Sequence, residues 1–173
     1  MSGRAWIVFG ALLLGADALA AGPHEHGVVK LDVAIEANRV TLLMDTPLAN
    51  LVGFERAPRT DAERQRVDAA LTALQAAGAL FRVDPAAGCI AGPVSMNASA
   101  LEGDKPGAAA GDAGHADLDA SYSFKCRAAP AHIDLRLFES FPAVQRIEVQ
   151  LLSGAKPSRR TLTRPAARLT LRP

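Results

Sequence analysis

The sequence is poor in the features that mark many classes of protein. Its 173 residues include two cysteines, one tryptophan and one tyrosine, and the formal net charge at pH 7 is +1. Phosphate binding requires a basic excess on one face, so we expect no nucleic-acid partner. The G-x-S-x-G, P-loop and H-E-x-x-H motifs are also missing, and no pattern ties a nucleophile to a base. We therefore predict that the protein is not an enzyme.

Long apolar runs are scarce, and the one that occurs lies at the N-terminus. Arg4 precedes an apolar segment over residues 5–14, and Ala18-Leu19-Ala20 has the small-x-small pattern that signal peptidases cleave. A membrane-spanning helix needs roughly 20 apolar residues, and Asp17 interrupts this run. We predict a cleaved signal peptide at residues 1–20 and one mature domain over residues 21–173, with no membrane span after the signal is removed.

The two cysteines fit an exported protein. Cys89 and Cys126 are the only pair available, and an oxidising compartment would join them. Cysteines this far apart do not resemble a redox C-x-x-C motif, and two thiolates alone seldom form a zinc site. We predict a structural disulfide, whose closed loop would contribute roughly 4 kcal/mol in the chain-entropy description.

The first part of the mature chain has the pattern of a β-hairpin. Apolar and polar residues alternate over residues 29–36 and again over residues 39–45. If Glu36 faces Arg39, apolar residues lie opposite one another and so do opposite charges, which is how cross-strand pairs stabilise a sheet. This register is our prediction for the hairpin.

One substantial helix is expected after the hairpin. Thr60 and Glu63 have the capping-box spacing, so we predict a main helix over about residues 60–77 that ends at Gly78. A Gly/Ala-rich segment without periodicity predicts a flexible loop at about residues 102–114. Alternating segments predict further strands at residues 80–83, 90–96, 115–126, 133–137 and 147–151 and in the tail from residue 162. The sum is an α+β fold of mostly antiparallel β-sheet with one disulfide.

The histidines are the candidate functional residues. His24 and His26 are two residues apart just before the first strand, and His115 and Asp117 repeat that spacing at the start of another. Residues i and i+2 of an extended chain share a face, about 7 Å apart, so each pair can converge on one ion. Three imidazoles and a carboxylate suit Zn²⁺, although imidazole also suits copper and nickel. The alternative is that His24 and His26 are polar residues of an N-terminal tail and that His115 is a residue at a loop end. We expect His132 to be a strand-edge residue and not a ligand.

These residues resemble the ZrgA-type family of bacterial periplasmic proteins linked to zinc uptake. The resemblance covers nearly the whole mature chain, and its most specific part is Asn50–Pro58. The other parts are His24–Gly27, the stretch from His115 to Cys126, and Leu137–Pro142. It implies zinc binding in the periplasm without enzymatic activity, in support of a zinc importer component. By position it implies His24, His26 and His115 as ligands, with Asp117 and Glu25 as further candidates.

One departure from the family concerns the loop before His115. Many such proteins carry a long segment there that is rich in His, Asp and Glu, whereas this chain has no histidine between Cys89 and His115. The resemblance therefore implies a single folded site and no metal-scavenging loop. Two hypotheses follow: a periplasmic zinc-binding accessory protein, or a metal-independent envelope interaction module that uses the polar sheet face or the Asn50–Pro58 connection.

Overall fold

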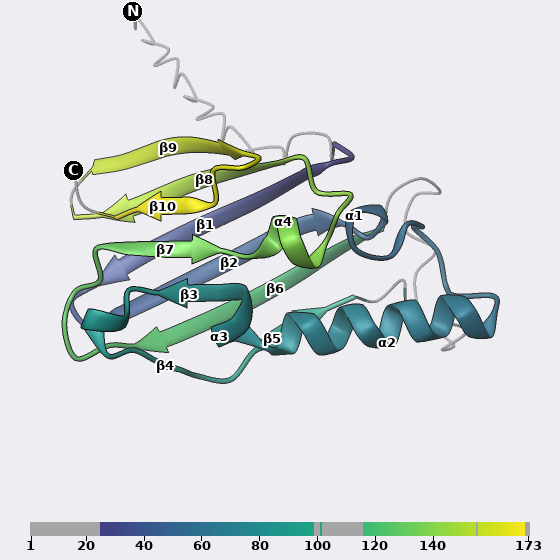
Figure 1. The fold of residues 1–173 in the computed structure, drawn as a ribbon, viewed down its shortest axis with the longest axis horizontal. Helices are drawn as coiled ribbons and strands as arrows, with labels where there is room; N and C mark the ends of the chain where they lie inside the picture. The colour runs from purple at the N-terminus through teal and green to yellow at the C-terminus, as the bar shows by residue number, and fades with distance from the viewer. Residues whose placement is uncertain (1–24, 99–100, 102–115, 155, 172–173) are drawn as a thin grey trace, which may run out of the picture.

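The computed structural model describes residues 25–98, 101, 116–154 and 156–171. The predicted signal peptide, His24, His115 and the predicted loop at residues 102–114 lie outside these ranges. The described chain forms a seven-stranded sheet with a smaller three-stranded sheet, one longer helix and several short helices on one side of it (Figure 1). The predicted α+β fold is confirmed, and all but one of the paired strand neighbours are antiparallel.

The large sheet has the strand order β4-β6-β2-β1-β8-β9, and β5 also pairs with β6. Its strands are β1 (Val28–Glu36), β2 (Arg39–Pro47), β4 (Ile90–Ala91), β5 (Ser95–Asn97), β6 (Asp117–Lys125), β8 (Arg146–Ser153) and β9 (Lys156–Thr163). The small sheet has the order β10-β7-β3, with β3 (Phe81–Val83), β7 (His132–Leu135) and β10 (Arg168–Thr170). The one parallel pair joins β1 to β8, far apart in sequence.

The hairpin register predicted from the sequence is confirmed. Glu36 lies opposite Arg39, and the pairing continues without a slip to Lys30 opposite Asp45. Ala37 adopts a left-handed conformation at the turn, with φ of 47°. Complementary cross-strand pairs therefore determine the register. The turn contributes less, because alanine disfavours the left-handed conformation that Ala37 adopts.

The main helix is confirmed as α2 (Asp61–Gln75), and Thr60 and Glu63 form the capping box. The expectation that Gly78 ends this helix is wrong. The helix ends at Gln75, and Gly78 lies in a separate short helix, α3 (Ala77–Leu80). The break after Gln75 redirects the chain so that Ala77 and Leu80 are buried in the core. Burial of this apolar surface outweighs the tendency of Gly78 to end a helix.

The remaining elements are short, and two of them differ from the expectation. The segment at residues 90–96 forms two separate strands, β4 and β5, and Leu137 lies in a helix rather than in β7. The short helices are α1 (Ala49–Val52), the 3₁₀ turn η1 (Pro85–Ala87) and α4 (Leu137–Ser140). The predicted disulfide is confirmed: Cys89 is bonded to Cys126, and it joins the chain before β4 to the end of β6.

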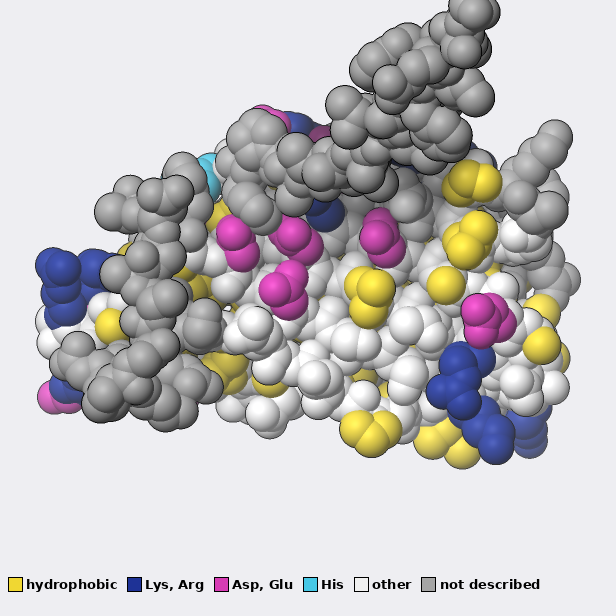
Figure 2. All heavy atoms as spheres, turned by 180° about the vertical axis from the view of Figure 1, so that it is seen from behind, with side chains coloured by type: hydrophobic (Ala, Val, Ile, Leu, Met, Phe, Trp, Pro, Cys, Tyr) yellow, Lys and Arg dark blue, Asp and Glu magenta, His cyan; other side chains and the backbone are white. Residues whose placement is uncertain are grey.

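The core lies between the large sheet and the layer formed by the small sheet and the helices. Buried residues alternate along the four long central strands, as in the pattern of β6, and they pack against Val67, Ala70 and Leu74 of α2. The opposite face of the large sheet carries the polar half of each alternation and is seen from behind in Figure 2. Within the described part of the chain, no helix is both long enough and apolar enough to cross a membrane.

Candidate functional site

The candidate site lies at one end of the large sheet. Strands β1 and β6 both run antiparallel to β2, so both begin at the end where β2 finishes. Asp117 begins β6 opposite Pro47, and the N–H of Leu48 donates to the carbonyl of Ala116 at 2.8 Å. His26 precedes β1 by two residues. The topology therefore places His26 and Asp117 at the same end of the sheet.

Asn50 on α1 fixes the start of β1. Its side-chain oxygen accepts a hydrogen bond from the N–H of Gly27 at 2.6 Å, and its amide donates to the carbonyl of Val28 at 2.8 Å and to Thr46 Oγ1 at 3.0 Å. Asn50 is only 3% exposed, so these bonds replace those that water would make. The side chain thus joins α1, the end of β2 and the start of β1 into one junction.

Gly27 completes this junction from the other side. Its carbonyl accepts from the N–H groups of both Gln145 and Arg146 at the start of β8. Its φ is +82°, and a Cβ there would lie 3.0 Å from side-chain carbons of Gln145. This position requires glycine because it combines a left-handed backbone with a close neighbour. The residue directly after His26 is consequently held on two sides.

His26 is paired with a carboxylate that the sequence analysis did not single out. Its Nε2 lies 2.7 Å from Oε1 of Glu55, whose side chain is only 13% exposed, whereas the His26 side chain is 63% exposed. Histidines that bind metal through one ring nitrogen usually donate the other N–H to a carboxylate, which fixes the ring orientation. With Nε2 on Glu55, a metal ion would bind at Nδ1.

The segment that carries Glu55 is tied to the start of α2. Arg56 forms two hydrogen bonds with the Glu63 carboxylate, at 3.1 and 2.7 Å, and the N–H of Arg59 donates to the same carboxylate at 2.6 Å. These bonds, the Arg56 one above all, lower the pKa of Glu63 from 4.5 to about 2. Phe54 lies under the guanidinium of Arg56, 5.0 Å from the ring centre. Glu55 therefore sits in a fixed connection.

Glu25 has a different partner. Its carboxylate forms two hydrogen bonds with Arg146, at 3.1 and 2.6 Å, and these bonds and the Arg146 charge lower the pKa of Glu25 below its ordinary value. Arg146 also contacts Glu148 on β8. The implied role of Glu25 as a ligand would require it to leave this ion pair.

Of the four predicted ligands, the structure describes His26 and Asp117. His24 and His115 are not among the described residues, and within the described ranges no three His, Cys, Asp or Glu side chains are grouped closely enough to hold a metal ion. Asp117 lies at the expected strand start, and His132 begins β7 in the other sheet. The sequence analysis did not single out the contacts of Glu55 and Asn50, although both residues fall in the segment that carries the most specific family resemblance.

Comparison with known proteins assigns the chain to one family. No curated protein sequence matches the chain. The family described as "ZrgA family zinc uptake protein" matches residues 23–171, a range that contains the whole junction around Asn50 and both strand starts. The match covers nearly the whole chain, and the protein therefore belongs to the ZrgA family of zinc uptake proteins.

Proposed function

We propose that this protein is a periplasmic zinc-binding accessory protein that supports zinc uptake, and that it binds Zn²⁺ through His24, His26, His115 and Asp117. The observation that carries the proposal is the His26–Glu55 pair at the end of the sheet where Asp117 begins β6. The protein acts by holding the ion or passing it to a zinc importer component, without catalysis.

The geometry of the sheet supports a shared site. Strands β1 and β6 are separated by β2 alone, so equivalent positions on them are about 10 Å apart. Side chains from both strands can meet over that distance around an ion with bonds of about 2 Å. His24 is covalently joined to Glu25 and His115 to Ala116, and both of these described residues lie at this end of the sheet.

Glu55 acts in this proposal as a positioning residue. A zinc-binding histidine must be neutral and correctly turned, and a carboxylate on Nε2 selects the tautomer that leaves the lone pair on Nδ1. The partly buried carboxylate and the bonds around Arg56 hold this acceptor in place before the ion arrives.

The disulfide supports the location. A bond between Cys89 and Cys126 forms and persists in an oxidising compartment, which agrees with export by the predicted signal peptide at residues 1–20. A periplasmic protein of a zinc uptake family meets its ion before import.

Zinc titration by calorimetry tests the proposal on the mature protein, residues 21–173. We expect His26→Ala combined with His115→Ala to abolish binding, and Glu55→Gln to weaken it about 10- to 100-fold, the usual cost of losing an outer partner of a ligand. His132→Ala is the matched control, since His132 lies in the small sheet, and it should bind as the unchanged protein does.

Two results would exclude the proposal. One is the absence of zinc binding by the unchanged mature protein below micromolar concentration. The other is an unchanged affinity in the double histidine variant.

The second candidate function is a metal-independent envelope interaction module. It is favoured by the exposed apolar side chains on the polar sheet face, of which Leu43 is 52% exposed. An importer component that binds equally well with and without a zinc chelator would support this function over the first.

A further inference from the structure

On the open face of the large sheet, on the side away from the core, charged side chains of β1, β2 and β6 form two rows that cross the strands. Asp32 and Asp117 lie on the same face outside these rows. The side chains of each row are cross-strand partners on β1, β2 and β6. The first row reads positive, negative, negative, and the second reads negative, positive, positive. The first row is Lys30, Asp45 and Asp119, and the second is Glu36, Arg39 and Lys125. Each row is therefore the charge complement of the other, strand by strand.

We propose that the open face binds a second copy of this chain through a two-fold axis that runs across the strands between the two rows. Such an axis turns each strand onto itself with its direction reversed, so the first row of one copy meets the second row of its partner. Asp45 then faces Arg39 of the partner subunit, and Asp119 faces Lys125 of the partner subunit. Lys30 faces Glu36 of the partner subunit, and symmetry doubles these three pairs.

The residues between the two charged rows suit a contact near the axis. Leu43 of one copy meets Thr41 of the partner subunit, and Ser121 meets Ser123 of the partner subunit. Asp32 meets Ala34 of the partner subunit and is the one charged side chain between the rows on these three strands. An axis along β2 would instead exchange β1 with β6 and keep each row opposite itself, so Asp45 would face Asp45 of the partner subunit and Arg39 would face Arg39 of the partner subunit. The charge pattern thus selects one of the two arrangements.

Exposed apolar side chains lie at separate places on the same face. The large hydrophobic side chains that are exposed in the described ranges are Leu43 at 52%, Leu152 at 47% and Ile90 at 75%. Leu152 is the cross-strand partner of Ala34, and Ile90 is the partner of Lys125, so both share the face of Leu43. An interface that covers these side chains removes their apolar surface from water, which favours association.

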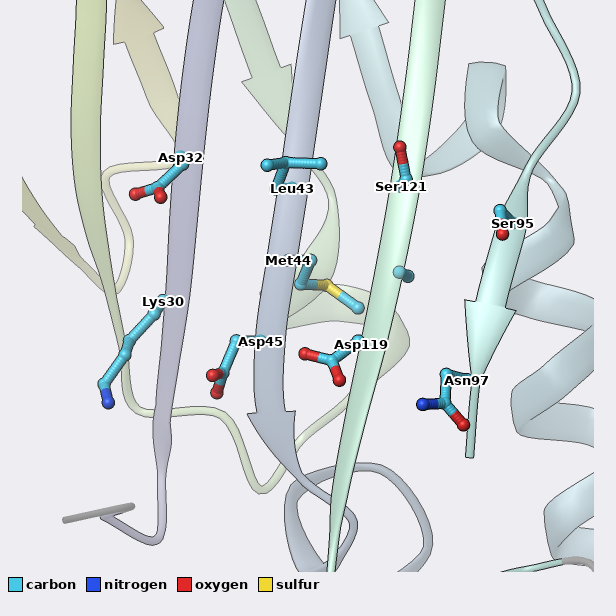
Figure 3. A pocket seen from close by; sticks show the side chains of 10 residues that line it. Lys30, Asp32, Leu43, Met44, Asp45, Ser95, Asn97, Asp119 and Ser121 are labelled. Atoms are coloured by element: carbon cyan, nitrogen blue, oxygen red, sulfur yellow. The ribbon is translucent and has the colours of Figure 1, made fainter. Parts of the chain in front are cut away.

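The first row borders a hollow that could receive long basic side chains. The hollow has a volume of about 430 Å³ and is lined by Lys30, Asp45, Asp119, Asn97 and Leu43 among others. Figure 3 shows Asp45 and Asp119 side by side on neighbouring strands, between Lys30 and Asn97. Packed sheets cross at about 30°, and the long side chains of Arg39 and Lys125 can span the resulting offset. Figure 2 shows basic side chains at one corner of this face with an acidic side chain beside them, and the other acidic side chains in the middle of the view lie further across the face.

The face is large enough for a stable dimer. Strands β1, β2 and β6 have 9 residues each and β8 has 8. At the usual strand rise and spacing, these four strands cover about 30 Å by about 19 Å. Two such faces bury about 1,100 Å² in total, just above the roughly 1,000 Å² expected of a biological interface.

Sedimentation velocity of the mature protein over a range of concentrations tests the proposal through a charge swap. We expect Asp119→Lys alone and Lys125→Asp alone each to raise the dimer Kd about tenfold, because each creates two like-charge contacts per dimer. The variant that combines both substitutions restores opposite charges across the axis, so its Kd should return close to that of the unchanged protein. Higher salt should weaken the unchanged dimer, since exposed pairs are screened.

Asp68→Lys is the matched control, because it makes the same change in charge at an exposed position on α2, away from the open face. It should leave the dimer Kd unchanged. The proposal is overturned if the unchanged protein stays monomeric up to about 1 mM, where even a weak complex would be half formed. It is also overturned if the combined variant stays as weakened as the single variants.

Discussion

Replacement of Asn50 by alanine should destabilise the protein more than any exposed amide substitution. The change removes the acceptor for the N–H of Gly27 and the donor for the carbonyl of Val28, both in a buried junction. A buried polar group left without a partner costs about 1–3 kcal/mol. The Thr46 hydroxyl still reaches the Val28 carbonyl at 3.4 Å and offsets part of that loss. We therefore expect the free energy of unfolding to fall by about 3 kcal/mol.

Urea denaturation followed by circular dichroism measures this loss directly. For a chain of this size, about 3 kcal/mol corresponds to a fall in Tm of about 6–12 °C. Gln65→Ala on the exposed face of α2 removes an amide of similar kind and should change the free energy of unfolding by less than about 0.5 kcal/mol. If Asn50→Ala proves as stable as Gln65→Ala, the amide does not hold the junction together and the reasoning is refuted.

Three further changes test other parts of the structure. The lowered pKa of Glu63, about 2 against 4.5, means that its carboxylate stabilises the fold above about pH 4.5 and that this contribution is lost as the pH falls towards 2. Glu63→Gln should thus lower Tm at pH 7 and flatten its fall in acid, whereas parallel curves for both proteins would contradict the ion pair. Reduction of the bond between Cys89 and Cys126, which are 37 residues apart, should lower the free energy of unfolding by about 2–4 kcal/mol in denaturation with and without a reductant. Gly27→Ala should lower the free energy of unfolding by about 1–2 kcal/mol because the φ of Gly27 is +82°. Gly78→Ala should raise Tm slightly, because Gly78 lies in α3 with open space around it. The reverse order of the two Tm values in a thermal melt would be evidence against the backbone argument.

The sequence determined those parts of the fold that depend on neighbours along the chain. Alternation of apolar residues identified the hairpin, and matching apolar residues and charges gave its register, because a slip by one residue would turn every core side chain outward. The capping box located the start of α2, since it depends only on Thr60 and Glu63. The end of α2 was not predictable in the same way, because it depends on where Leu80 must be buried.

For the candidate site too, the features that depend on nearby residues were predictable and those that depend on distant segments were not. The spacing of His24, His26, His115 and Asp117 could be read from the sequence as two pairs at strand starts, and the disulfide followed from there being only two cysteines. That β1 and β6 begin at one end of the sheet required the strand order, which no local pattern encodes. The partnership of His26 with Glu55 links positions 29 residues apart through a bend held by Arg56.

What the sequence determined by itself is therefore the list of elements, the hairpin register and the chemical types available to bind an ion. What only the tertiary structure decided is which side chains meet: Asn50 with Gly27, His26 with Glu55, and the two charged rows on one open face. The physical reason is that periodicity and capping act over a few residues, whereas these contacts depend on burying the core between two sheets, which settles the position of every distant segment at once.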